Sequence, residues 1–154
     1  MRLVMFLLSL SVLGQANALA QEAAPDSKIE LIQQFLAAFN AQNSKKMGEL
    51  VTPDVKWLSV ANGVAATDVE GRPTLVKAMD DYFVSCPSCR SIISDMMPSR
   101  DRVSAIEVAT WQTRDGPKSQ QSLAIYEFSN SLISAVYYFP AELVDTSDNE
   151  FPTS

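Results

Sequence analysis

Histidine is absent from the 154 residues of this sequence. Its absence excludes a histidine general base, a serine–histidine–aspartate triad and most zinc sites. Any acid–base chemistry must therefore come from carboxylates, tyrosine, lysine or water held by arginine. Glycine is also scarce, with five residues, and none of them belongs to a glycine-rich phosphate-binding loop. We accordingly expect no metal and no cofactor.

Basic residues are fewer than acidic ones, 12 against 18, and the net charge is −6. Nucleic acids and anionic lipids bind through basic patches, so neither is expected as a partner. Beyond the first twenty residues, no apolar run reaches the length of a membrane-spanning helix. We therefore expect no membrane association after the amino-terminal segment is removed.

The sequence has only two cysteines, Cys86 and Cys89, in a C-x-x-C spacing. In an exported protein this spacing favours a small local disulfide. A redox-active pair is the alternative, but redox C-x-x-C motifs normally open a helix and this pair follows a predicted one. A metal site would need further thiols or histidines, which the sequence lacks.

The first twenty residues have the features of an export signal. Met1-Arg2 supplies a positive charge, residues 3–13 are almost wholly apolar, and Ala18-Leu19-Ala20 is a small-x-small cleavage site. We expect a secreted or periplasmic protein that begins at Gln21. Residues 21–27 are then a linker, 28–140 a single domain, and 141–154 an acidic flexible tail.

Apolar residues at helical spacing predict three helices, which begin near Ser27, Ser44 and Arg72. The first opens with an S-x-x-E capping box, the second stops before Pro53, and the third has Pro73 in its first turn. Alternating patterns predict strands at 55–60, 91–97, 103–113, 119–128 and 132–139. Helices followed by an antiparallel meander indicate an α+β fold.

The late strands are apolar on both faces. In strand 103–113, Ala105, Ala109 and Trp111 share one face, while Ile106 and Val108 share the other. Three short helices can cover only one face of such a sheet. The opposite face needs another partner, and we expect a second copy of the chain, which makes a homodimer.

Two stretches carry a resemblance to a known family. Residues 32–43, IQQFLAAFNAQN, and 50–57, LVTPDVKW, resemble the opening of the nuclear transport factor 2-like superfamily in its SnoaL-like branch. Glu70-Gly71-Arg72-Pro73 before a helix, and Tyr137-Tyr138-Phe139 at the end of a strand pair, fit the same branch. The resemblance covers about residues 28–140 and implies a cone: three helices packed on a curved, mostly antiparallel sheet around an apolar pocket, commonly in a dimer.

The resemblance also implies where chemistry would lie. Ketosteroid isomerases of this superfamily use a tyrosine, an aspartate base and a protonated aspartate. The matching positions here hold Phe35, Ser59 and Tyr126, and only the tyrosine could donate a hydrogen bond to a ligand. An isomerase mechanism of that type is therefore disfavoured, and histidine-dependent dehydratases are excluded.

Four aromatic residues are candidates for binding a ligand in the implied pocket, and Tyr126 is a candidate to orient its polar group. The alternative for all of them is ordinary core packing. The four are Phe35, Trp57, Trp111 and Phe128.

Glu107 is the most unusual residue of the late strands, because strict alternation places it on the apolar face with Ala105. A carboxyl there would have a raised pKa and could act as an acid or base together with Tyr126. A bulge would instead turn Glu107 toward solvent or the dimer interface. After a turn at Asn62-Gly63, Asp68 and Glu70 are expected in a loop at the pocket mouth.

Three functions remain open on this basis. The first is an exported domain that binds a small, mostly apolar molecule. The second is a lyase, isomerase or cyclase that acts on a small hydrophobic carbonyl compound without histidine or metal. The third is a dimeric interaction module whose cavity is filled by its own side chains.

Overall fold

The computed structural model describes residues 25–144, so the predicted signal peptide, the linker residues 21–24 and the tail from 145 onward lie outside the described residues. The described elements are α1 (Pro25–Asn40), α2 (Ser44–Glu49), β1 (Val51–Ala61), β2 (Val64–Glu70), α3 (Arg72–Ser85), β3 (Arg90–Pro98), β4 (Arg102–Thr113), β5 (Gly116–Ser129), β6 (Leu132–Tyr138) and β7 (Glu142–Leu143).

The three predicted helices are present, with small differences at their starts. α1 begins two residues before Ser27, with an acidic residue in its first turn. The residue that caps the start of α2 is Asn43 and not Ser44. The Asn43 side chain accepts a hydrogen bond from the Lys46 backbone at 2.9 Å. Ser44 is buried and donates to Asp80 on α3 at 2.5 Å, so it ties α2 to α3.

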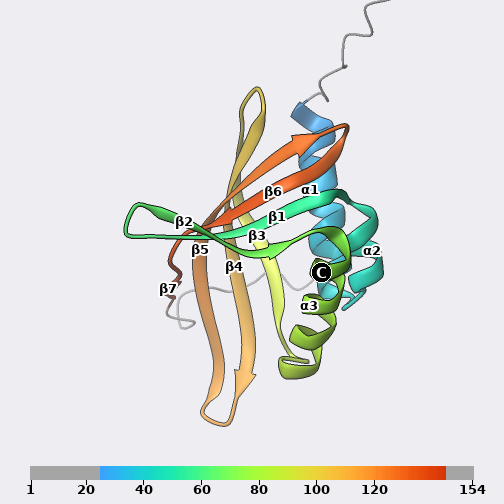
Figure 1. The fold of residues 1–154 in the computed structure, drawn as a ribbon. Coiled ribbons are helices and arrows are strands. Elements are labelled where there is room, and N and C mark those ends of the chain that lie inside the picture. The colour runs from blue at the N-terminus through green and yellow to red at the C-terminus, as the bar shows by residue number, and fades with distance from the viewer. Residues whose placement is uncertain (1–24, 145–154) are drawn as a thin grey trace, which may run out of the picture.

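The strands form one curved, unclosed sheet in the order β2-β1-β6-β5-β4-β3, and β7 pairs with β5 (Figure 1). All neighbours are antiparallel except β1 and β6, which are parallel. This mixed sheet with its helices at the amino-terminal end confirms the predicted α+β class and the cone-like architecture.

Strand β2 was not predicted, and it corrects the position of two acidic residues. Asp68 and Glu70 lie in β2 and are exposed, whereas a loop at the pocket mouth was expected. The reason is that nearly all of β2 is exposed, so it lacks the alternating apolar residues that identify a strand. The turn at Asn62-Gly63, with φ of 52° and 76°, folds β2 back onto β1.

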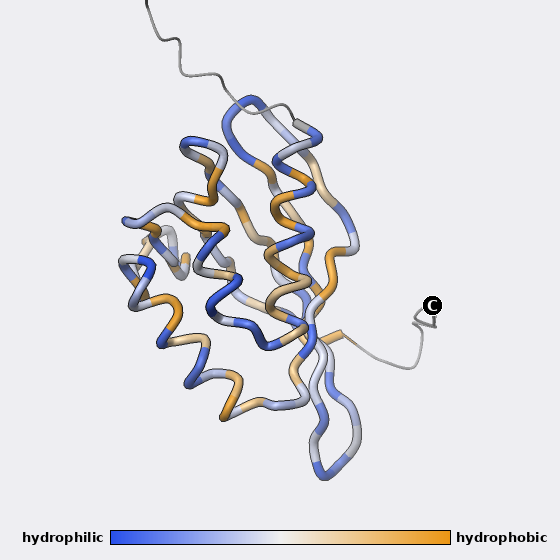
Figure 2. The backbone as a smooth tube through the Cα atoms, turned by 90° about the vertical axis from the view of Figure 1, so that its right-hand side faces the viewer, coloured by the Kyte–Doolittle hydropathy of each residue, from blue (hydrophilic) through white to orange (hydrophobic). Residues whose placement is uncertain are grey.

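The helices cover one face of the sheet, where α1 packs against β3 and α3 packs against β1. The core between them includes Ile32, Phe35, Leu75, Val103 and Tyr126. In Figure 2 the turns at the two far ends of the sheet, β3–β4 at the top and β4–β5 at the bottom, are hydrophilic. No helix within residues 25–144 is long and apolar enough to cross a membrane.

Candidate functional site

A cavity of about 370 Å³ lies between the helices and the sheet face that they cover. Its volume is within the range of small-molecule sites, so the described side chains do not fill it. The predicted interaction module with a filled cavity is therefore disfavoured. The lining residues are Phe35, Leu36, Phe39, Trp57, Met79, Tyr82, Ser91, Glu107, Ala109, Gln120, Ser122, Tyr126 and Tyr138.

The carboxyl group of Glu107 lies in this cavity, and the residue is only 7% exposed. Tyr126 donates its hydroxyl hydrogen to Oε1 of Glu107. Tyr138 donates to the same carboxylate, with its hydroxyl 3.0 Å from Oε1 and 2.9 Å from Oε2. The face predicted for Glu107 and Tyr126 is the face on which the structure places them.

Small residues in the sheet allow Glu107 to contact the two tyrosines. Ala105 on β4 pairs with Ala124 on β5, which in turn pairs with Tyr138 on β6. Both alanines are almost fully buried. Their short side chains occupy little volume, which leaves space above the sheet for Glu107 and the two tyrosines to reach one another.

Burial controls the protonation of all three groups. Burial raises the pKa of Glu107, and the hydrogen bonds from Tyr126 and Tyr138 oppose that rise. Burial also raises the pKa of both tyrosines well above the ordinary tyrosine value, and the neighbouring carboxylate adds to the effect. Both hydroxyls therefore stay protonated at neutral pH and act as donors.

Aromatic rings form much of the wall. The Phe35 and Trp57 centroids are 6.0 Å apart, and Trp57 stacks on Tyr138 at 5.1 Å. Phe39 lies 5.8 Å from Tyr82, whose hydroxyl donates to Sγ of Cys89 at 3.3 Å. Two of the predicted ligand-binding residues, Phe35 and Trp57, thus line the cavity.

The other two predicted binding residues, Trp111 and Phe128, are not among the residues that line this cavity. Trp111 pairs with Lys118 near the end of the β4–β5 hairpin, which projects past the helices in Figure 1. Phe128 follows a bulge in β5, and the Lys28 ammonium group lies 5.8 Å from its ring. Alternation identifies the face of a residue, but it does not show how far the helices extend over that face.

Tyr138 is a site residue that the sequence reasoning did not assign. The adjacent Tyr137 and Tyr138 point to opposite faces, and a register change of one residue exchanges them. Tyr138 is the tyrosine on the helix-covered face, because it pairs with Ala124 of the core. The tyrosine doublet was the available signal, but the bulge in β5 that sets its register has no clear sequence mark.

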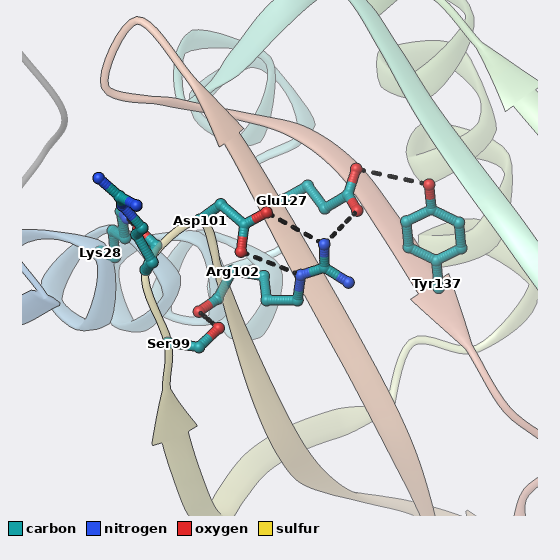
Figure 3. Close-up of polar contacts among 7 residues, drawn as sticks. Lys28, Ser99, Asp101, Arg102, Glu127 and Tyr137 are labelled. Carbon is teal, nitrogen blue, oxygen red and sulfur yellow. Dashed lines mark hydrogen bonds and ion pairs between the residues drawn. The ribbon is translucent and has the colours of Figure 1, made fainter.

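Tyr137 belongs to a polar cluster on the other face of the sheet (Figure 3). Arg102 donates to Asp101 at 3.0 Å and lies 4.0 Å from Glu127, which accepts a hydrogen bond from Tyr137 at 3.4 Å. Arg102 and Glu127 are partly exposed. These contacts are those of a surface network and do not connect with the cavity.

The predicted disulfide between Cys86 and Cys89 is present. It closes a short loop between α3 and β3, which stabilises the chain by about 2 kcal/mol in the chain-entropy account. The adjoining strand is held by Asn40 of α1, which donates to the Ser91 carbonyl at 2.7 Å and accepts from the Ser91 amide at 2.8 Å. Within residues 25–144 no group of three or more acidic or cysteine side chains could hold a metal ion.

Comparison with protein families matches residues 32–136 to the SnoaL-like domain. No curated protein sequence matches the chain. Several solved structures share the fold. An uncharacterised cystatin-fold protein from Novosphingobium aromaticivorans has a TM-score of 0.64 and 20% identity, over 73% of this chain and 97% of its own.

Two further structures contain small organic molecules. A protein from Mycobacterium tuberculosis in complex with estradiol-17β-hemisuccinate has a TM-score of 0.60 and 14% identity, over 73% of this chain and 92% of its own. A protein with a ketosteroid isomerase-like fold from Catenulispora acidiphila, in complex with trimethylamine, has a TM-score of 0.61 and 16% identity, over 72% of this chain and 85% of its own. The TM-scores establish a common fold, and at these low identities the similarity shows the fold alone.

Proposed function

Since this chain belongs to the SnoaL-like domain family, we propose that it binds a small, largely apolar molecule in its cavity. The observation that carries the proposal is a carboxyl group, Glu107, held by two tyrosine hydroxyls inside an aromatic-walled cavity. A fully packed core would not need this polar group, whose burial is unfavourable unless it is well bonded. The two structural neighbours with bound organic molecules support the same function.

The two tryptophans provide a direct test, because Trp57 lines the cavity and Trp111 does not. In the Trp111→Phe variant, the remaining tryptophan fluorescence comes from Trp57. We expect a hydrophobic probe such as naphthol to change this signal in a saturable way. The Trp57→Phe variant, which keeps Trp111, is the control and should show no such change. Absence of saturation in the Trp111→Phe variant, for naphthol and for extracts of the host organism, would contradict the proposal.

A second candidate function is enzymatic, because Glu107 is placed to transfer a proton to or from a bound molecule. A lyase, isomerase or cyclase acting on a small hydrophobic carbonyl compound would use Glu107 as its acid or base and Tyr126 to orient the oxygen. The Glu107→Gln variant should then lose turnover and retain most of its binding, because a proton donor or acceptor acts chiefly on the transition state. Equal loss of both would favour a binding role.

We also propose that the protein is exported, on the strength of its amino-terminal pattern. Intact mass measurement of protein recovered from its own host should give a chain beginning at Gln21 with no alkylatable thiol, because the disulfide is formed. A chain that retains Met1 would contradict export by cleavage of this segment.

A further inference from the structure

The cavity contains an acidic group without a basic one. Glu107 and six aromatic rings line it, and no lysine or arginine is among its lining residues. Histidine is absent from the sequence, and the structure describes every basic residue except Arg2. Lys46, Lys77 and Arg102 make their ion pairs on the surface.

The hydrogen bonds around Glu107 favour its charged form. Both tyrosine hydroxyls donate toward the carboxylate, and donation to a carboxylate stabilises the anion. Burial acts in the opposite direction, because a carboxylate without a positively charged partner is unfavourable in an apolar cavity. A positive charge delivered by a ligand would remove that penalty.

The walls of the cavity also suit a cation. The faces of aromatic rings are electron-rich and attract alkylated ammonium groups, most strongly for tryptophan. Six of the thirteen lining residues are aromatic: Phe35, Phe39, Trp57, Tyr82, Tyr126 and Tyr138. The cavity therefore combines a carboxyl group, electron-rich walls and enough volume for a compact organic group.

Ser91 is another polar residue of the cavity wall. Ser91 is only 6% exposed, and its hydroxyl has no hydrogen-bond partner among the residues that the structure describes. Ser91 lines the cavity and pairs with Ala109, two residues from Glu107 on the neighbouring strand. This oxygen is enclosed by protein atoms, so the ligand class follows from Glu107 and the aromatic wall.

From this arrangement we infer that the ligand is an organic cation, an alkylated amine whose nitrogen lies beside Glu107 and whose apolar part contacts the aromatic wall. The inference rests on the proposed binding function and specifies its ligand class. Electrostatic complementarity gives the selectivity: a neutral molecule of the same shape gains the wall contacts but not the pairing with Glu107.

A cationic ligand fixes the sign of the pH dependence. A permanently charged ligand requires the ionised carboxylate, so its affinity increases as pH rises through the pKa of Glu107. A neutral ligand that accepts a hydrogen bond from protonated Glu107 shows the opposite trend. The other titratable groups that line the cavity are Tyr82 of α3, Tyr126 of β5 and Tyr138 of β6, and burial raises the pKa of each. They stay neutral over the range in which Glu107 titrates.

The experiment uses choline and its neutral carbon isostere, dimethylbutanol, with Trp57 fluorescence in the Trp111→Phe protein as the readout. At neutral pH we expect choline to bind about tenfold more tightly or better, the effect of a desolvated charge on aromatic and carboxylate groups. Choline affinity should fall with decreasing pH, while dimethylbutanol affinity should not. The Glu107→Gln variant should lose the preference for choline, and Glu127→Gln, which changes a carboxylate on the other sheet face, should keep it.

The outcomes separate the cationic ligand from the proposed function. Equal binding of the two isosteres, or choline binding that is independent of Glu107 and pH, overturns the cationic ligand and leaves a small-molecule site. Binding of naphthol without binding of choline overturns the cationic ligand in the same way. Failure of all three probes and of extracts of the host organism overturns both proposals. Circular dichroism of each variant shows whether it is folded, and the pH series on the unsubstituted Glu107 protein decides the question if Glu107→Gln does not fold.

Discussion

At the scale of single residues, Glu107 makes the stability of the protein depend on pH. Its pKa is raised by burial in the folded chain, so the folded protein holds this proton more tightly than the unfolded chain. This contribution to stability is complete below the unfolded pKa of about 4.3 and is lost as pH rises through the folded value. Each pH unit between the two values removes about 1.4 kcal/mol.

We therefore expect Glu107→Gln to flatten the decline in the free energy of unfolding as pH rises from acid toward neutral. Urea denaturation at a series of pH values measures this slope. Glu127→Gln is the control, because its side chain is 35% exposed on the opposite face of the sheet. Identical slopes in wild type and Glu107→Gln would show that the carboxyl titrates normally.

Tyr126→Phe should destabilise the protein by about 1.5–3 kcal/mol at neutral pH, the usual value of a hydrogen bond to a charged group. Tyr126 is fully buried, and its hydroxyl donates to Glu107. The cost should be smaller in acid, where the carboxyl is protonated. Thermal or urea unfolding at both pH values measures the difference.

Tyr137→Phe is the matched control for that substitution, because its 3.4 Å hydrogen bond to Glu127 lies on the partly exposed face. Its effect should stay within about 0.5 kcal/mol, as for most surface substitutions. An equal loss of unfolding free energy in the two variants would mean that the buried hydrogen bond stabilises the protein no more than the exposed one.

Strand alternation was sufficient to predict that Glu107 and Tyr126 share the helix-covered face, because a period of two is a property of the local chain. It did not predict that Tyr138 completes their network or that Trp111 lies beyond the cavity. Those facts depend on the register between strands and on the length of the covering helices, which involve residues distant in the sequence.

At the scale of elements, Asn40 joins the end of α1 to the start of β3 through two hydrogen bonds with the Ser91 backbone. Asn40→Ala should destabilise the protein by about 1–3 kcal/mol, because it leaves two partly buried backbone groups unpaired. Urea unfolding measures this loss. Because Ser91 lines the cavity, ligand affinity should also fall.

Asn40→Asp separates the contributions of the two hydrogen bonds. It keeps the acceptor for the Ser91 amide and replaces the donor with a second acceptor facing the Ser91 carbonyl. We expect it to be destabilised as well, since two oxygens then face each other without a hydrogen. Full stability of Asn40→Asp would indicate that the carbonyl contact contributes little.

Helices and central strands were predictable from sequence because burial of one face imposes a period on their residues. β2 was not, because its stability comes from pairing with β1 across the Asn62-Gly63 turn and not from a buried face of its own. The start of β1 at Val51 was missed for a related reason. Pro53 suggested a break, yet the structure includes it in the strand.

At the scale of the whole molecule, the sheet face away from the helices supports the proposed homodimer. Ile92 and Met97 on β3 are 45% and 67% exposed, and Ile106 and Ile125 on β4 and β5 are partly exposed. Ile106→Asp or Ile125→Asp should give monomers, because an unpaired charge buried in an interface costs several kcal/mol. Sedimentation velocity at micromolar concentration measures the change.

Val84→Asp is the control for the dimer, because Val84 lies on α3 and is 84% exposed. It should leave the sedimentation coefficient unchanged. A wild-type protein that sediments as a monomer at these concentrations would contradict the dimer directly, without any variant.

The parallel pairing of β1 with β6 has a consequence for how the chain folds. The neighbours of β1 in the sheet are β2, which follows it at once, and β6, which follows only after α3 and three further strands. A nascent chain that ends before Leu132 therefore exposes one whole edge of β1, and its cavity lacks Tyr138. Such high contact order slows folding and prolongs the exposure of unpaired strand edges. The domain should acquire its native structure only after β6 has been synthesised, and dependence on chaperones during that interval is the expected result of this topology.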